Sequence, residues 1–408
     1  MRTIALILLS LPTCVAVSQF SWEQRADLPL SGLWGPATFV IGDKGYVVSG
    51  RSNGVDITNV WMYDPDLDTW TPRAPIPVAR RFAAGFAING KGYVACGLNS
   101  VSNQLADVWE YDPVADVWTS KANFPGDARY GTCHFAVGGY GYLGTGNLGS
   151  SSGPYATNMY AYDPVSNSWS TRASIPGMAR YGTSTITAGG KAYVIGGRVA
   201  DLTYTDDIYE YDASSNSWLL RTPFPGSRRT YAMAFSYNTD GVIVAGHDGT
   251  VNLYDAHRFL PSMNLWSTVP TYPGEAGWVG ANMAISGRSF GGLGYRLSSG
   301  LDHDDWWELV KEGTMPGMME IASCEMGSLS IHPDPVEVGQ LLRFDWSDLG
   351  QAGMHYRMEI FNIGGGLAWS DRMGFGQTLV CPELGQGLYT VRLQRDDNLM
   401  WRARFVVM

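Results

Sequence analysis

The stretch from Ala192 to Pro225 reads AYVIGGRVADLTYTDDIYEYDASSNSWLLRTPFP, and its pattern recurs along most of the chain. An apolar run ends in a small residue and a glycine (here Gly196-Gly197, the glycine pair), a Tyr-Asp pair follows, and then come a tryptophan and, seven residues later, a proline. The tryptophan returns at intervals of 48 to 51 residues, each time with its proline. The six tryptophans are Trp22, Trp70, Trp118, Trp169, Trp218 and Trp266. Two markers that keep one spacing six times indicate an internal repeat.

Each repeat contains short strand signals. Runs such as 192–195 and 108–111 are β-branched or aromatic and are bounded by turn residues, which is typical of strands. We find no amphipathic helix of useful length. The glycine pair, the Tyr-Asp pair and the tryptophan, at a period near fifty, resemble the kelch repeat over roughly residues 20–311. The resemblance implies a β-propeller in which each repeat is one four-stranded blade.

The two ends of the repeat region predict how the ring closes. The last repeat has three strand signals but no tryptophan at the expected place, whereas Trp22 has no strands before it. We therefore expect Ser21–Arg25 to form the fourth strand of the last blade, because a closed ring leaves no open sheet edge. The predicted fold is all-β: a six-bladed kelch β-propeller over residues 19–311, a linker over 312–325, and a small C-terminal β-sandwich over 326–408.

The N-terminal segment has the composition of a secretory signal peptide over residues 1–18. Arg2 precedes the apolar run Ile4–Leu11, and Ala16-Val17-Ser18 fits a cleavage site. The net charge is −10 and no basic run is present, which argues against a nucleic-acid partner. The cysteines of the mature chain lack the close spacing of a zinc site or a disulfide framework, and a Cys324–Cys381 bridge remains open.

The C-terminal region follows a different pattern of alternating strands. Four elements mark it: Pro333-Asp334-Pro335, Glu359–Gly364, Gly387-Leu388-Tyr389 and Arg404–Val407. They resemble the C-terminal sorting domain of the type IX secretion system. The resemblance implies export through the periplasm to the cell surface or the medium, with the type IX machinery as the partner of residues 326–408. An ordinary accessory sandwich is the alternative.

A propeller has two faces, and the chain predicts which residues lie on each. We call the end where the chain enters the innermost strands, and where the loops after the glycine pairs lie, the front face. Hairpins such as Asn89–Gly92 lie on the back face. Arginines are expected on the front face at Arg51, Arg81, Arg129, Arg180, Arg198 and Arg229. Aromatic residues begin the innermost strands at Trp34, Phe82, Tyr130, Tyr181, Tyr231 and Trp278.

These residue types suit an acidic ligand. Guanidinium groups bind carboxylates or phosphates with two parallel hydrogen bonds, and aromatic rings stack on the apolar faces of sugars. A structural role is the competing interpretation, since arginines also bond loop carbonyls and aromatics pack between blades. The ligand hypothesis rests on asymmetry: the last repeat has Glu275 and Gly277 where others have arginine, and the front loops of repeats three and six are the longest. We expect those two loops to face each other across the channel.

Two function classes follow. The first is a secreted binding protein that recognises an extracellular glycan or protein through its front face. The alternative is a carbohydrate-active enzyme of the sialic acid mutarotase kind, for which Glu275 near Arg229 is the pair of interest. His247, followed by Asp248, is the candidate for acid–base work. No metal or cofactor is predicted, because the acidic run at 302–305 includes a position that recurs in every repeat and favours a loop role.

Overall fold

A computed structural model describes residues 20–311, except 102, 151, 201–202, 238 and 276–277, and seven strands between 331 and 407. The chain divides into two compact units, Met1–Glu312 and Gly313–Met408, which we describe separately. Every regular element in these described ranges is a strand. Over the same residues, no helix has the length and apolar character needed to cross a membrane. The predicted signal peptide, the linker and Cys324 and Cys381 lie outside the described residues.

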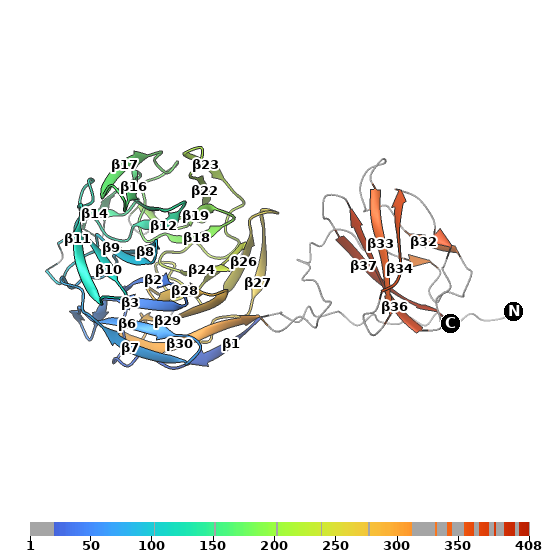
Figure 1. The fold of residues 1–408 in the computed structure, drawn as a ribbon, viewed down its shortest axis with the longest axis horizontal. Coiled ribbons are helices and arrows are strands. Elements are labelled where there is room, and N and C mark those ends of the chain that lie inside the picture. The colour runs from blue at the N-terminus through green and yellow to red at the C-terminus, as the bar shows by residue number, and fades with distance from the viewer. Residues whose placement is uncertain are drawn as a thin grey trace. The chain divides into compact units, whose positions relative to one another are not determined.

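The first unit is a ring of six four-stranded antiparallel sheets (Figure 1). Blades one and two contain β2 (Ala37–Ile41), β3 (Lys44–Val48), β6 (Val60–Asp64) and β7 (Thr69–Arg73), then β8 (Ala84–Ile88), β9 (Lys91–Ala95), β10 (Val108–Asp112) and β11 (Val117–Lys121). Blades three and four contain β12 (Cys133–Val137), β13 (Tyr140–Gly144), β16 (Met159–Asp163) and β17 (Ser168–Arg172), then β18 (Ser184–Ala188), β19 (Lys191–Ile195), β22 (Ile208–Asp212) and β23 (Ser217–Leu220). Blades five and six contain β24 (Met233–Tyr237), β25 (Asp240–Val244), β26 (Ala256–Leu260) and β27 (Leu265–Val269), then β28 (Ala281–Ile285), β29 (Arg288–Arg296), β30 (Leu301–Lys311) and β1 (Phe20–Arg25).

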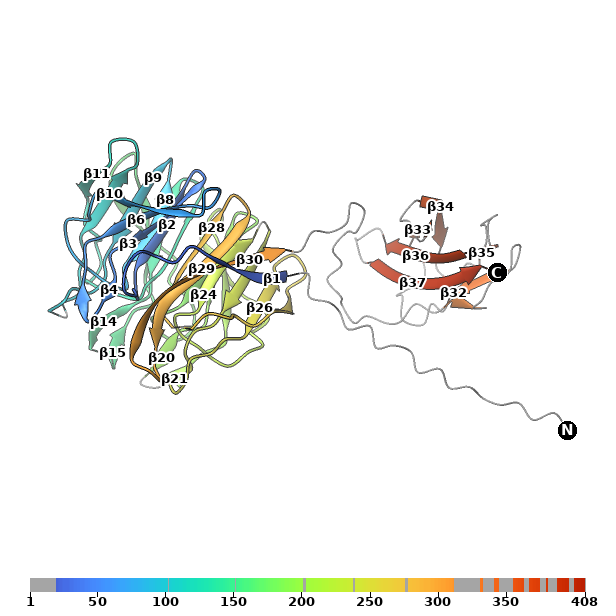
Figure 2. The ribbon, with the colours of Figure 1, turned by 90° about the horizontal axis from the view of Figure 1, so that it is seen from below.

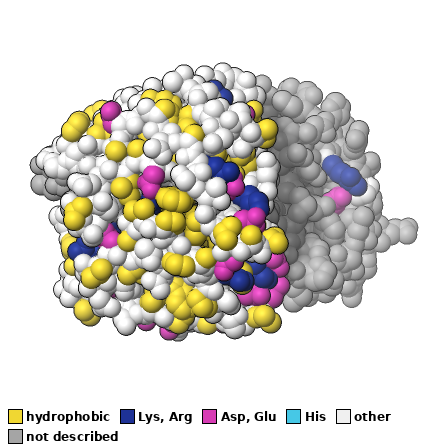
Figure 3. Space-filling model, turned by 60° about the vertical axis from the view of Figure 1, so that its left-hand side comes forward, with side chains coloured by type: hydrophobic (Ala, Val, Ile, Leu, Met, Phe, Trp, Pro, Cys, Tyr) yellow, Lys and Arg dark blue, Asp and Glu magenta, His cyan; other side chains and the backbone are white. Residues whose placement is uncertain are grey.

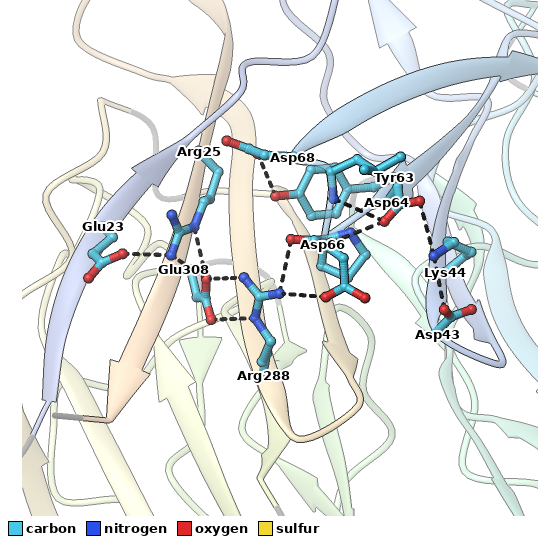
Figure 4. Close-up of polar contacts among 12 residues, drawn as sticks. Glu23, Arg25, Asp43, Lys44, Tyr63, Asp64, Asp66, Asp68, Arg288 and Glu308 are labelled. Carbon is cyan, nitrogen blue, oxygen red and sulfur yellow. Dashed lines mark hydrogen bonds and ion pairs between the residues drawn. The ribbon is translucent and has the colours of Figure 1, made fainter. Parts of the chain in front are cut away.

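The predicted closure is confirmed. Strand β1 pairs antiparallel with β30, with Trp22 opposite Leu309, and completes blade six. Glu308 joins three segments at this closure (Figure 4): it accepts hydrogen bonds from Arg25 Nε at 2.8 Å and from Arg288 Nε and Nη2 at 2.8 and 2.7 Å. Arg288 Nη1 also donates to Pro65 O in blade one at 2.9 Å. One buried carboxylate therefore links the N-terminal strand, blade six and, through Arg288, blade one.

The repeated residues of the sequence attach each blade to the one before it. Trp118 Nε1 on β11 donates to Ala74 O of the preceding blade at 2.9 Å. Asp116 accepts from Ala74 N at 3.0 Å and from Tyr111 Oη at 2.6 Å. The tryptophan therefore recurs because each blade needs the same attachment, and the other five tryptophans make the equivalent bond. The aspartate of the Tyr-Asp pair, Asp112, instead accepts a hydrogen bond from Val114 N of its own turn at 2.9 Å.

The core lies in layers between neighbouring blades. The innermost strands contact one another around the channel. The second strands approach the preceding blade closely, since a Cβ added at Gly92 would lie 2.2 Å from the ring of Phe39. A side chain at Gly92 would force these sheets apart, so the small residue is required by packing. On the side shown in Figure 3, basic and acidic side chains of the coloured residues lie next to one another around scattered apolar patches.

Short hairpins extend the front face. They are β4 (Arg51–Ser52) with β5 (Val55–Asp56), β14 (Asn147–Ser150) with β15 (Gly153–Tyr155), and β20 (Arg198–Ala200) with β21 (Thr203–Tyr204). Figure 2 shows them at one end of the propeller together with the extended tip of β29 and β30. Phe20 pairs with Lys311 in the first unit, so the two ends of the ring leave the last blade side by side.

The described strands of the second unit form two sheets. β34 (Leu367–Gly374), β33 (His355–Asn362), β36 (Gly387–Arg395) and β37 (Met400–Val407) form one in that order, and β31 (Ile331–His332), β32 (Leu341–Phe344) and β35 (Leu379–Val380) form the other. Of the motifs quoted for the sorting domain, Pro333-Asp334-Pro335 lies outside the described residues. The β-sandwich and its sorting role therefore remain predictions.

Candidate functional site

The arginines at the blade entrances are structural. Arg180 is completely buried: its Nη2 donates to Asp207 Oδ2 at 2.9 Å, its Nη1 contacts the other carboxylate oxygen, and its Nε donates to Met178 O at 3.1 Å. Arg129 makes a single equivalent bond, from its Nη1 to Asn158 Oδ1 at 2.7 Å. Each arginine thus ties the entrance of its blade to the polar residue that precedes the third strand.

This arrangement corrects the sequence interpretation in two respects. Arg129, Arg180 and Arg229 do not line an open face, because their guanidinium groups are buried and bonded within their own blades. The arginine of blade two at this position is Arg80, which bonds Asp107 at 2.9 and 2.7 Å, and not Arg81. The concentration of arginine over blades two to five therefore has a structural cause.

Arg81 lies one residue further along, on the front face. Its Nη1 lies 2.8 and 2.6 Å from the two oxygens of Asp56, whose side chain is fully buried. Arg51 approaches the same carboxylate at only 3.5 Å, and within the described part of the chain this is its one polar side-chain contact. Both guanidinium groups lie 5.9 Å from the ring centroid of Trp34. Because Arg81 holds Asp56 at 2.8 and 2.6 Å, Arg51 makes only a longer contact with that carboxylate.

Aromatic rings form a continuous floor across the front of the channel. Trp34, Tyr130, Tyr181 and Trp278 occupy equivalent places, each in a backbone bridge to the residue after a glycine pair. The ring contacts that join the floor are Trp278–Tyr295 at 6.0 Å, Tyr295–Trp34 at 5.9 Å, Trp34–Phe82 at 5.4 Å, Phe82–Tyr130 at 5.8 Å, Phe82–Tyr231 at 5.1 Å and Tyr130–Tyr181 at 5.9 Å. Tyr130 and Tyr181 are buried, whereas Trp34, Phe82, Tyr231, Tyr295 and Trp278 are half-buried.

A pocket of about 430 Å³ opens where blade six meets blade one. Its walls are the rings of Trp34, Trp278 and Tyr295, with Arg51 and Asp302 as its charged groups. Asp302 Oδ2 accepts a hydrogen bond from Asn53 N at 2.8 Å, which holds the β29–β30 tip against blade one. The volume is in the range of small-molecule sites, and aromatic walls with a few polar groups are typical of them.

His247 and Glu275 do not complete this pocket as catalytic groups. His247 is buried, and its Nδ1 accepts a hydrogen bond from Gly249 N at 3.0 Å. Burial lowers the pKa of His247, so the ring stays neutral while it packs against Trp278 at 4.9 Å. Glu275 forms an ion pair with Arg296 on the exposed surface. It does not pair with Arg229, whose guanidinium group forms an ion pair with Asp255. The pair expected for an enzyme therefore does not converge.

Each of the two longest front loops packs against the next blade in the ring. Tyr155, in the loop of blade three, packs against Tyr181 of blade four at 4.8 Å. Tyr295, at the tip of blade six, packs against Trp34 of blade one. Each loop therefore builds a wall with the next blade in the ring.

Sequence reasoning missed Tyr295, Asp302 and Asp56. The glycine of blade six that matches the others is Gly294, with φ 109°, and its N–H bonds Leu33 O at 2.8 Å. The adjacent glycines Gly291-Gly292 lie earlier in β29, and Tyr295 follows Gly294 at the place where Arg51 and Arg198 stand in other blades. A bulge between Gly292 and Gly294 shifts the register, and no repeat signal in the sequence marks it.

Comparisons with known proteins agree with this fold. A kelch motif matches residues 179–225. The chain is 26% identical to Kelch-like protein 25 of Xenopus tropicalis over 275 residues, which cover 64% of this chain and 45% of the relative. It is 28% identical to Beta-scruin of Limulus polyphemus over 192 residues, which cover 45% of this chain and 16% of the relative. The chain thus spans less than half of the length of either relative.

The solved structure of YjhT superposes on the propeller with a TM-score of 0.61, at 17% identity, and covers 69% of this chain and 95% of that chain. At such an identity the likeness concerns the fold alone. The matched motif, the ring of six sheets and this superposition lead to one conclusion: residues 20–311 have the fold of a six-bladed kelch β-propeller.

Proposed function

We propose that the propeller is a secreted or cell-surface binding module whose front pocket takes an acidic glycan. The observation that carries the proposal is the position of Arg51 in the pocket wall. Its side chain is 27% exposed, and the nearest carboxylate is already bound by Arg81. Its guanidinium fork is therefore able to pair with a ligand carboxylate or sulfate.

The residues of the pocket wall favour a sugar over a ligand that binds through charge alone. Trp34 and Trp278 each present part of a ring, and aromatic rings stack on the apolar faces of pyranoses. Asp302 adds a carboxylate that is able to accept hydrogen bonds from sugar hydroxyls. Kelch domains generally bind protein partners, so a protein ligand on the same face is the competing outcome.

A glycan array probed with the full chain tests this proposal. We expect acidic glycans to bind, and Arg51→Ala to weaken the best of them by roughly tenfold to a hundredfold, as expected for the loss of a charge-assisted hydrogen bond. Trp278→Ala should weaken binding as well, whereas Tyr140→Ala, an exposed aromatic on a back-face hairpin, should not. Absence of glycan binding, or full affinity in Arg51→Ala, would refute the proposal.

The export route is proposed on the sequence alone. The signal segment and the C-terminal motifs support passage by the type IX machinery through residues 326–408. The enzyme of the sialic acid mutarotase kind stays the second hypothesis for function, although Glu275 and Arg229, the pair on which it depended, bind other partners.

A further inference from the structure

We propose that the central channel of the propeller holds a second ligand site, which takes a small, neutral, hydroxyl-rich molecule such as a polyol or a monosaccharide. This channel site lies beneath the aromatic floor and is separate from the front pocket of blade one, so it goes beyond the proposed function. The six innermost strands surround the channel (Figure 1). It contains an upper cavity of about 100 Å³, under Phe82 and Tyr231, and a lower cavity of about 300 Å³.

The two cavities follow one another along the channel. Three residues line both of them: Thr38, His134 and Asn282. The upper cavity is also lined by residues just before the innermost strands, such as Thr132, and the lower one by residues further toward the back face, such as Ala136. The rings of Phe82 and Tyr231 meet over the upper cavity, with centroids 5.1 Å apart. A ligand therefore reaches the channel site from the back face.

The residues of the upper cavity include three buried hydroxyl oxygens that have no hydrogen-bond partner in the described part of the chain. They are Thr132 Oγ1, Thr183 Oγ1 and Tyr231 Oη. The whole of Thr132 is only 4% exposed. A hydroxyl group buried without a partner costs free energy, so folded proteins rarely leave such groups unpaired. Three of them around one cavity therefore indicate polar groups that a ligand satisfies.

The three hydroxyl groups lie on the side of blades three and four. Tyr231 reaches there from blade five: a Cβ added at Gly131 would lie 2.4 Å from its Oη, which places this oxygen beside the residue before Thr132. The Cγ2 methyl group of Thr132 lies next to Gly146 of its own blade, 3.0 Å from where a Cβ would stand. Since Thr132 also lines the upper cavity, its hydroxyl is the group left to face that cavity. Thr183 repeats this arrangement in blade four.

The chemistry of the channel wall selects a neutral ligand. Among the described residues that line the two cavities there is no Asp, Glu, Lys or Arg, so a charged ligand would be buried without a counter-charge. Burial lowers the pKa of His134, so its ring is neutral. The Nδ1 atom of His134 donates to Thr132 O at 3.2 Å, because a carbonyl oxygen only accepts. The Nε2 atom is therefore an acceptor for a ligand hydroxyl.

The size and the apolar part of the wall suit a small polyol or sugar. Pro36, Ala83 and Ala232 line the upper cavity together with the hydroxyl groups, so a ligand there meets both polar and apolar surface. Polyols and sugars carry hydroxyl groups on a framework of C–H groups and match such a wall. The upper cavity is several times larger than the space one water molecule needs, and the lower cavity is in the range of small-molecule sites.

Titrations of the full chain with glycerol, erythritol and D-xylose, followed by saturation-transfer NMR, test the channel site. We expect at least one of the three to bind. Thr132→Val and Tyr231→Phe should each weaken its binding by about twofold to tenfold, as expected for the loss of one neutral hydrogen bond. Thr132→Val should also raise the melting temperature of the ligand-free protein by about 2 °C, because it removes a buried hydroxyl without a partner. Weaker binding by a more stable variant is a result that unfolding does not produce.

Thr119→Val is the matched control, because Thr119 is exposed on β11, the outermost strand of blade two, and lines neither cavity. Glycerate, an anion close in size to glycerol, should not bind. Arg51→Ala should leave polyol binding unchanged, which separates the channel site from the front pocket. No binding of any of the three probes, or full affinity in both Thr132→Val and Tyr231→Phe, would refute the channel site alone. Polyol binding without any glycan binding on the array would refute the proposed function alone.

Discussion

Phe82 and Tyr231 close the front of the channel by contacting each other across it, with ring centroids 5.1 Å apart. Both have a left-handed backbone, at a position where Gly35, Gly131 and Gly182 stand in three other blades. Such a conformation costs about 1 kcal/mol or more for a residue with a Cβ, so packing across the channel must offset it. Because the mouth is covered, a ligand on the front face rests on the aromatic floor.

Arg180 and Arg51 should respond oppositely to removal. Arg180→Ala leaves the carboxylate of Asp207 without its buried partner, so we expect the free energy of unfolding to fall by about 3 kcal/mol, while glycan affinity in the folded fraction is kept. Arg51→Ala should lower affinity and leave stability nearly unchanged. Denaturant unfolding and calorimetry on both variants measure this. If Arg180→Ala lost affinity while its stability was unchanged, Arg180 would be a ligand-binding residue and its structural assignment would be wrong.

Asp305 should destabilise the fold at neutral pH, unlike Asp255, which occupies the same position in blade five. Burial raises the pKa of Asp305, and the hydrogen bonds from Trp307 and the Glu275 amide do not offset this rise. A raised folded pKa favours the folded state below the ordinary carboxyl pKa of 3.8, and this contribution is lost as the pH rises through the raised value. Asp305→Asn should therefore raise the melting temperature at pH 7 and have little effect near pH 3.

Asp255→Asn is the matched comparison for Asp305→Asn. Burial tends to raise the pKa of Asp255, but hydrogen bonds from His257 and Arg229 outweigh it and hold the pKa well below 3.8. Its contribution to stability is present above that value and is lost in acid. We expect Asp255→Asn to lower the melting temperature at pH 7. Equal effects of the two substitutions across pH would contradict both assignments.

Glu308 should control the closure of the ring. Burial tends to raise its pKa, but Arg288 and Arg25 hold it below 4.5, so its contribution is present above that pH and is lost as the pH falls through the lowered value. Glu308→Gln should lower the free energy of unfolding by about 3 kcal/mol at neutral pH. Urea unfolding at pH 7 and below pH 4 measures the difference, which should shrink in acid. A constant difference would show that the effect is not ionic.

Residues 326–408 should act as an export signal. In a host with the type IX machinery, a chain ending at residue 325 should accumulate in the periplasm as a folded propeller, because the first unit contains the whole ring of six sheets. Cell fractionation with immunodetection measures where the chain accumulates, and the full chain is the control. Unchanged surface display of the shortened chain would rule out the signal.

The repeat and the closure were predictable from the sequence because local chemistry determines both. Trp118 bonds a backbone carbonyl and Asp116 a backbone amide of the neighbouring blade, so the tryptophan recurs in every blade and an Asp or Asn recurs in blades one to five. Trp22 is separated from its blade by most of the chain, yet the tryptophan missing from the last repeat identified its place.

The roles of the arginines and the position of the pocket depended on tertiary structure. Arg180 was visible in the sequence, as was the repeated acid Asp207, but only the packed blade shows that the two groups are bonded. Arg80 enters the interior of the blade, whereas Arg81 lies on the front face. The sequence shows two adjacent arginines and does not indicate which of them is buried in the blade. The pocket joins Arg51 to Asp302, which lie at opposite ends of the propeller sequence and meet only because the ring closes. Sequence periodicity therefore determined the scaffold, whereas side-chain burial and ring closure decided which of its charges face a ligand.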